Sequence, residues 1–124
     1  MPKSPVFSRT ALVQVLQEVI EALRDEGSFA QYDLSLNANG TSSSVWSDES
    51  TQRDALGWIL KKAFDHLMAD PQRARQLAYR FSEEINEKVL QIADRSLVTV
   101  SEEDGREAVV KILRQIIEEA NTAR

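Results

Sequence analysis

The chain has 124 residues, of which 42% are hydrophobic and 28% charged, with a formal net charge of −5 at pH 7 and no cysteine. These values are those of one globular domain, and they exclude wholesale disorder, disulfides, thiol nucleophiles and thiolate metal sites. The acidic balance argues against nucleic acid as a partner, because binding to phosphate backbones requires clustered Lys and Arg.

Residues 1–8 contain two prolines and no helical period, so we expect a flexible lead-in to a single domain at residues 9–120. This lead-in lacks the apolar centre of a signal peptide, and no apolar run approaches the roughly 18 residues of a membrane span. We therefore expect a cytoplasmic protein that contacts no membrane. Residues 121–124 are expected to fray.

The first predicted helix covers residues 9–26. Its apolar side chains recur three and four positions apart and therefore share one face: Leu12, Leu16, Val19, Ile20 and Leu23. Ser8 is the expected N-cap, and Gly27 can adopt the left-handed conformation that ends many helices.

A β-hairpin is predicted next, at about residues 31–47. Apolar and polar residues alternate with the two-residue period of a half-buried strand, in the order Tyr32, Asp33, Leu34, Ser35 and Leu36. A flexible serine-rich loop through residues 41–44 is the alternative to the hairpin.

Asn39-Gly40 is the expected hairpin turn, because this pair favours positive φ at both central positions. A tight turn there would place Leu36 opposite Ser43 and Leu34 opposite Val45. Trp46 would then point to the other face of the hairpin, beside Asp33. On that face it would be covered by a helix or available to a partner.

The second predicted helix, at residues 51–69, has the clearest apolar stripe of the chain. The stripe consists of Leu56, Ile59, Leu60, Ala63, Phe64 and Leu67. Thr51 and Asp54 resemble a capping box at its start. Phe64 lies in the middle of the stripe, so its truncation to Ala is expected to cost about 3–5 kcal/mol of stability.

A third, long helix is predicted at residues 71–93. Its stripe consists of Ala74, Leu77, Ala78, Phe81, Ile85, Val89 and Ile92. Asp70-Pro71 can open this helix, because Asp is a good N-cap and Pro fits the first helical position.

The C-terminal part predicts one more helix. Residues 97–100 are apolar and β-branched, which leaves a short strand and an extended connection open. Ser101 is the expected N-cap of a fourth helix that ends near residue 120, with Gly105 inside its first turns. The predicted fold is therefore mainly α, with four amphipathic helices packed as a small bundle and the hairpin between the first two.

No residues in the chain have the spacing of a catalytic, cofactor or metal site. The motifs Gly-x-Ser-x-Gly, Gly-x-x-x-x-Gly-Lys and Gly-x-Gly-x-x-Gly are absent. His66 is the only histidine, and we interpret it as an ordinary surface or boundary residue. Glu83 and Glu87 supply too few oxygens for a hard cation, and Arg80 is close enough to pair with them. We therefore expect a protein that is not an enzyme.

The hairpin, Trp46 and the helices that follow resemble the layout of an ATP-cone regulatory domain over about residues 32–113. Such a domain places a Lys-Arg pair before an Asp-Gly turn. This chain has Leu36-Asn37-Ala38-Asn39-Gly40 at that place. The charges that would bind phosphate are missing, so the resemblance does not assign the family.

Trp58 is the first candidate for an interface residue, because it falls about 160° from the centre of its helix stripe. Trp is enriched among residues that dominate binding energy, although the hairpin or another helix could also cover this side chain. Trp46 and Tyr79 are the other interface candidates. Tyr79, Leu90 and Val110 also lie off their stripes, and a homodimer would cover this excess of apolar surface.

The sequence leaves three functions open. The first is a small, soluble, non-catalytic interaction or regulatory protein, such as an adaptor, inhibitor or assembly subunit, that acts through protein-protein contacts. The second is a ligand- or nucleotide-sensing regulatory domain with a pocket between the hairpin and the helices. The third, DNA binding through residues 71–93, is disfavoured by the acidic charge.

Overall fold

The computed structural model describes residues 5–30 and 34–122, and in these ranges the chain is mainly α-helical. The elements in chain order are α1 (Arg9–Arg24), the 3-10 helix η1 (Glu26–Ser28), β1 (Ser35–Asn37), β2 (Ser50–Arg53), α2 (Ala55–His66), α3 (Pro71–Ala93), α4 (Leu97–Asp104) and α5 (Arg106–Thr122). The predicted combination of a mainly helical fold with one antiparallel hairpin is confirmed. The predicted number of four helices is wrong, because the described chain forms five α-helices.

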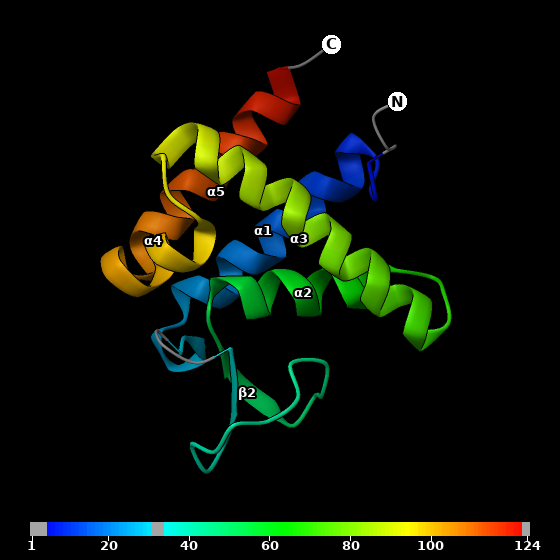
Figure 1. Ribbon diagram of the computed structural model, residues 1–124, viewed down its shortest axis with the longest axis vertical. Helices are drawn as coiled ribbons and strands as arrows, with labels where there is room; N and C mark the ends of the chain where they lie inside the picture. The colour runs from blue at the N-terminus through cyan, green and yellow to red at the C-terminus, as the bar shows by residue number, and fades with distance from the viewer. Residues whose placement is uncertain (1–4, 31–33, 123–124) are drawn as a thin grey trace.

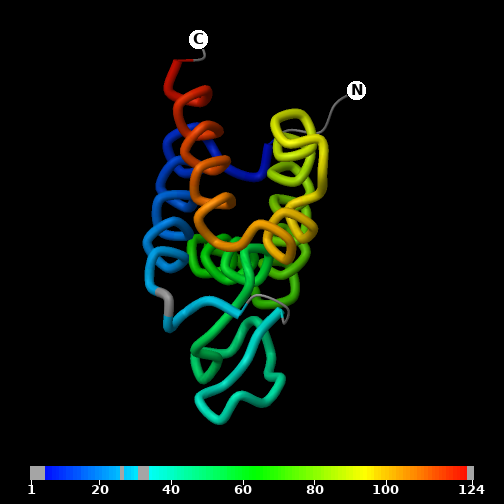
Figure 2. The backbone as a smooth tube through the Cα atoms, turned by 90° about the vertical axis from the view of Figure 1, so that its left-hand side faces the viewer, coloured from blue at the N-terminus to red at the C-terminus, as the bar shows by residue number. Residues whose placement is uncertain are grey.

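Helices α1 and α5 run alongside each other, α3 crosses them in Figure 1, and α2 lies at the end of these helices nearest the hairpin (Figures 1 and 2). α2 packs against both α1 and α3, while α1 packs against α5. The hairpin lies beyond α2, at the end of the molecule opposite to both chain ends (Figure 1). This arrangement makes α2 the layer between the helical core and the hairpin.

One hydrophobic core joins all five α-helices. Its largest fully buried side chains include Leu16, Leu23, Ile59, Leu60, Phe81, Ile85, Leu97, Leu113 and Ile116. Phe64, which the sequence places in the middle of the core stripe, is only half-buried and packs at the edge of this core. Phe81 takes the central position instead. Val110, off its stripe in the sequence, is buried within the fold.

Two predicted helix starts are confirmed. α1 begins after Ser8, whose hydroxyl accepts a hydrogen bond from the backbone N–H of Ala11. α3 spans the predicted residues, with Asp70 as N-cap and Pro71 in its first turn. In both cases the capping side chain and the apolar period indicate the same boundary.

α2 begins four residues later than predicted, because residues 50–53 form strand β2. Asp54 is itself the N-cap and accepts a hydrogen bond from the N–H of Gly57 at 2.7 Å. The predicted capping box that begins at Thr51 is therefore wrong. α1 also ends earlier than predicted, at Arg24, and η1 follows it.

The hairpin lies between η1 and α2 and spans residues 35–53 rather than 31–47; residues 31–33 of the predicted strand lie outside the described residues. β1 pairs with β2, so Ser35 lies opposite Arg53 and Leu36 opposite Gln52. Between these strands, the tight turn first returns the chain to β1, where Leu36 forms an isolated antiparallel bridge with Ser42. The predicted partner of Leu36, Ser43, is one residue out of register.

The turn itself is at the predicted place but has a different geometry. The Gly40 N–H donates to the Asn37 carbonyl at 3.0 Å, and the Asn37 N–H donates to the Thr41 carbonyl at 3.0 Å. Only Gly40 has positive φ, at 77°, so the predicted positive φ at Asn39 is wrong. The turn thus needs glycine at a single position.

Residues 97–104 form the helix α4, which replaces both predicted alternatives of a strand and an extended connection. Its N-cap is Ser96, whose hydroxyl accepts a hydrogen bond from the Thr99 N–H. Ser101, the predicted N-cap, is buried inside α4. Gly105, with φ of 84°, separates α4 from α5, so the predicted fourth helix is in fact two helices.

We expect Phe81→Ala to lower the free energy of unfolding by about 3–5 kcal/mol, because it empties a fully buried position. Phe64→Ala should cost less, since its ring is partly exposed. Urea denaturation of both variants measures the difference. A larger loss for Phe64→Ala would show that the centre of the core is misplaced.

Gly57→Ala should destabilise the hairpin although Ala favours a helix by about 1 kcal/mol. A Cβ atom at Gly57 would lie 2.3 Å from the Leu34 carbonyl oxygen and 2.9 Å from the Arg53 Cβ, so the hairpin must move away from α2. Hydrogen exchange at residues 35–53 should accelerate. Gly27→Ala is the matched control, because its nearest neighbour would be 3.4 Å away.

Candidate functional site

Three aromatic side chains of the described residues meet where the connection between β1 and β2 contacts α2 and α3. We call Trp46, Phe64 and Tyr79 the aromatic patch. The centroid of the Trp46 ring lies 5.2 Å from that of Phe64 and 5.5 Å from that of Tyr79. Tyr79 is 50% exposed, and the other two rings are half-buried.

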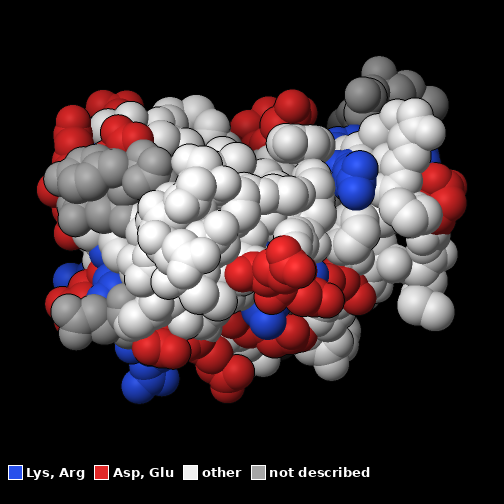
Figure 3. All heavy atoms as spheres, turned by 90° about the horizontal axis from the view of Figure 1, so that it is seen from below, with Lys and Arg blue, Asp and Glu red and all other residues white. Residues whose placement is uncertain are grey.

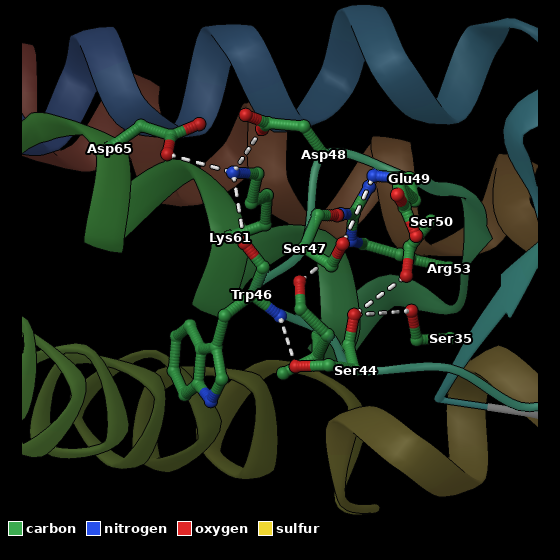
Figure 4. Close-up of polar contacts among 11 residues, drawn as sticks. Ser35, Ser44, Trp46, Ser47, Asp48, Glu49, Ser50, Arg53, Lys61 and Asp65 are labelled. Atoms are coloured by element: carbon green, nitrogen blue, oxygen red, sulfur yellow. Dashed lines mark hydrogen bonds and ion pairs between the residues drawn. The ribbon is translucent and has the colours of Figure 1, made fainter.

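Two buried cations hold the backbone that carries Trp46 (Figure 4). The Arg53 side chain, 2% exposed as a residue, donates from Nε to the Val45 carbonyl at 3.1 Å and from a terminal nitrogen to the Ser47 carbonyl at 2.8 Å. The Lys61 ammonium donates to the Trp46 carbonyl at 3.2 Å. Three consecutive carbonyl oxygens are therefore satisfied by side chains from β2 and α2.

Serine hydroxyls fix the two ends of this connection. Ser50, which is buried, donates to the Ser44 carbonyl at 2.6 Å, so Ser43 must donate in the 2.6 Å contact between the Ser43 and Ser50 hydroxyls. Ser35 donates to the same Ser44 carbonyl at 3.4 Å. The serine-rich stretch is thus part of a hydrogen-bonded network, and we name residues 44–50 the anchored loop.

The Lys61 ammonium is also paired with two carboxylates, Asp48 at 2.7 Å and Asp65 at 3.0 Å. Burial alone would lower the pKa of Lys61, but the hydrogen bonds and charges of both carboxylates outweigh it, so this pKa is raised above its usual value. The hydrogen bond and charge of Lys61 hold the pKa of Asp48 below its usual value. A raised lysine pKa stabilises the fold until the pH rises to that pKa, and a lowered aspartate pKa stabilises it until the pH falls to that pKa. The Lys61–Asp48 ion pair is therefore charged on both sides near neutral pH.

Trp46 presents its indole ring on the other side of this network. In Figure 4 the ring points away from the labelled hydrogen-bonding side chains. Arg75 of α3 lies over the ring, 5.9 Å from its centroid. Within the described residues, neither the Trp46 indole N–H nor the Tyr79 hydroxyl has a hydrogen-bond partner. Both groups can therefore bond to solvent or to another molecule.

Trp58 has a different environment. Its indole N–H donates to the Ser28 carbonyl at 2.9 Å. Arg53 lies 4.7 Å from its ring centroid and Lys62 lies 5.6 Å from it. Trp58 is half-buried and ties η1 to α2, so of the three interface candidates it is the one whose polar group is used inside the fold.

Trp46 and Tyr79 lie together in the aromatic patch, and Trp58 lies outside it, on the side of α2 that faces η1. Leu90, also exposed, is on α3 three turns beyond Tyr79. His66 is half-buried, pairs with Glu18 of α1 and lies 6.4 Å from the ring of Phe7.

Glu83, Glu87 and Arg80 line a groove of about 780 Å³ between the N-terminal segment, α3 and the end of α5. The groove also contains Arg9, Glu84 and Lys88, so its acidic and basic side chains balance. Burial raises the pKa of Glu84. This rise is offset only in part by the Val6 N–H, which donates to the carboxylate, and by the charges of Arg80 and Lys88. This charge pattern selects no class of ligand.

Figure 3 views the hairpin end of the molecule, from below in Figure 1. Uncharged side chains cover the middle of this face, and the charged groups around them are mostly Asp and Glu. Asp48 of the anchored loop has a side chain that is 95% exposed. The face therefore combines uncharged surface with exposed carboxylates.

No protein-family model, curated protein or solved structure matches this chain. In the part of the chain that the structure describes, no helix has the length and hydropathy needed to cross a membrane. Over the same residues, no three His, Asp or Glu side chains are grouped so that they could hold a metal ion.

Arg53 and Lys61 are the residues of the candidate site that the sequence did not reveal. Lys61 lies off the apolar stripe of α2 beside Lys62, and its four-residue spacing from Asp65 is typical of a solvated ion pair. Arg53 precedes the helix in a polar stretch. Their shared role depends on three carbonyl groups of a distant loop, which no local pattern encodes.

We expect Lys61→Met to release the anchored loop, because the Trp46 carbonyl loses its donor and Asp48 and Asp65 lose their common cation. The free energy of unfolding should fall by about 1–3 kcal/mol. Amide hydrogen exchange at residues 44–50 should also accelerate. Lys62→Met is the control, and an equal effect from both variants would contradict the anchoring role.

Proposed function

We propose that this chain is a small non-catalytic interaction protein that acts through protein-protein contacts made by the aromatic patch. The observation that carries the proposal is that, among the described residues, the Trp46 indole N–H and the Tyr79 hydroxyl have no hydrogen-bond partner while their rings lie together at the surface. Trp and Tyr are enriched at interfaces because they combine a large apolar area with a polar group at one end.

The rigidity of the anchored loop also supports binding. Side chains that are already ordered lose less conformational entropy when a partner docks, so more of the contact energy appears as affinity. Here Arg53 and Lys61 order the backbone on either side of Trp46, and Phe64 and Tyr79 restrict its ring. The patch is thus preorganised for a contact.

The alternative of a ligand- or nucleotide-sensing domain has less support. It needs a pocket between the hairpin and the helices. The groove of about 780 Å³ and the cavities of about 390, 470 and 800 Å³ are lined by the N-terminal segment and the helices, and none of these lining residues comes from residues 34–54. The aromatic patch therefore remains the better candidate.

A photoreactive phenylalanine analogue in place of Tyr79 tests the proposal. Irradiation of cells that make this variant should give a covalent adduct with a protein, because the ring at this position is exposed on the patch. The same analogue at Gln115, an exposed position on α5, is the matched control. No adduct from position 79, or equal adducts from both positions, would refute the proposed function.

A further inference from the structure

The charges around the aromatic patch are arranged with opposite signs on its two sides. Asp48 and Asp65 lie beside the Trp46 backbone, with side chains 95% and 41% exposed. Arg75, an exposed residue of α3, lies over the Trp46 ring, which points away from those carboxylates (Figure 4). The patch therefore has carboxylates beside the Trp46 backbone and a guanidinium group over the Trp46 ring.

Lys61 does not neutralise the combined negative charge of Asp48 and Asp65. Its side chain is only 9% exposed and contacts one oxygen of each carboxylate from within the fold. The other oxygen of Asp48 faces solvent on the anchored loop, and the lowered pKa of Asp48 keeps this carboxyl charged near neutral pH. The surface presented to a partner is therefore acidic at this side of the patch.

We propose that the aromatic patch binds a second copy of the same chain about a two-fold axis; this inference rests on the proposed function and names its partner. In a two-fold interface the same surface meets itself, so each group at one side faces a group from the other side. An axis through the aromatic patch places Arg75 of each copy against Asp48 and Asp65 of the other. The patch is thus complementary to itself in charge.

The same axis covers the apolar part of the patch. Trp46 and Tyr79 lie at the centre of the pair, where interface aromatic residues contribute most to binding. The charge pairs lie at the rim, where they set the orientation of the two copies. A partner with a uniformly basic surface would satisfy the Asp48 side but would place a cation against Arg75.

Charge reversal in two single variants tests this arrangement. Arg75→Glu alone and Asp48→Arg alone each place like charges together at both symmetric contacts of the dimer. Each variant should dimerise at least about tenfold more weakly than the wild type, because the contact occurs twice. Sedimentation velocity measures the change from a dimer to the 14.0 kDa monomer.

Mixing the two variants gives the decisive measurement. A two-fold heterodimer brings Glu at position 75 against Arg at position 48, next to an Asp65 that stays paired with Lys61, and keeps the native contact of Arg75 with Asp48 and Asp65 at the other side. The mixture should therefore recover dimers to within about threefold of the wild-type affinity. Arg73→Glu, on another side of α3, is the control and should leave the affinity within about twofold.

Circular dichroism melting tests whether each variant is folded. We expect Asp48→Arg to fold, because Asp65 continues to pair with Lys61. Should Asp48→Arg fail to fold, Asp65→Arg replaces it in the same mixture. The inference is overturned if the wild-type chain stays monomeric at high concentration. It is also overturned if the mixed variants dimerise no more tightly than each variant alone. An adduct between Tyr79 and a different protein would then leave the proposed function standing, and the absence of any adduct would refute both.

Discussion

The structure at the hairpin end depends on two buried cations that hold three consecutive backbone carbonyls. Taking a charged side chain out of water costs several kcal/mol unless hydrogen bonds and opposite charges replace the lost solvation. Arg53 and Lys61 meet this requirement with the carbonyls of residues 45–47 and, for Lys61, with two carboxylates. The two cations can be buried because the anchored loop supplies acceptors, and the loop keeps its shape because the cations bind its carbonyls.

This interaction also explains why so short a sheet is ordered. A two-stranded hairpin is marginally stable alone, and β1 and β2 have only three and four residues. Its stability comes from α2, where Gly57 allows the backbone near Leu34 to approach closely and Lys61 binds the Trp46 carbonyl. The hairpin is an extension of α2 rather than an independent unit.

Some elements of this fold could be predicted from the sequence, and others could not. α3 was predictable because Asp70, Pro71 and a long apolar stripe all indicate one boundary and one face. β2 and α4 were not, because polar residues 50–53 form a strand only by pairing with β1, and residues 97–100, three of them β-branched, form a helix that buries Leu97 and Val100 in the core. Tertiary contacts override local propensity at both places.

Of the candidate site, Tyr79 could be named from sequence because it lies off its helix stripe, and Trp46 because the predicted hairpin places it on a face that needs a cover. What covers each tryptophan could not be named, since this depends on whether a backbone carbonyl lies within reach of the indole N–H. Ser28 supplies one for Trp58, and the described chain supplies none for Trp46. Two tryptophans of similar partial burial thus differ in a single hydrogen bond. That difference, set by the fold rather than by either residue, uses the indole N–H of Trp58 inside the fold and leaves the indole N–H of Trp46 open to solvent or to the partner that we propose.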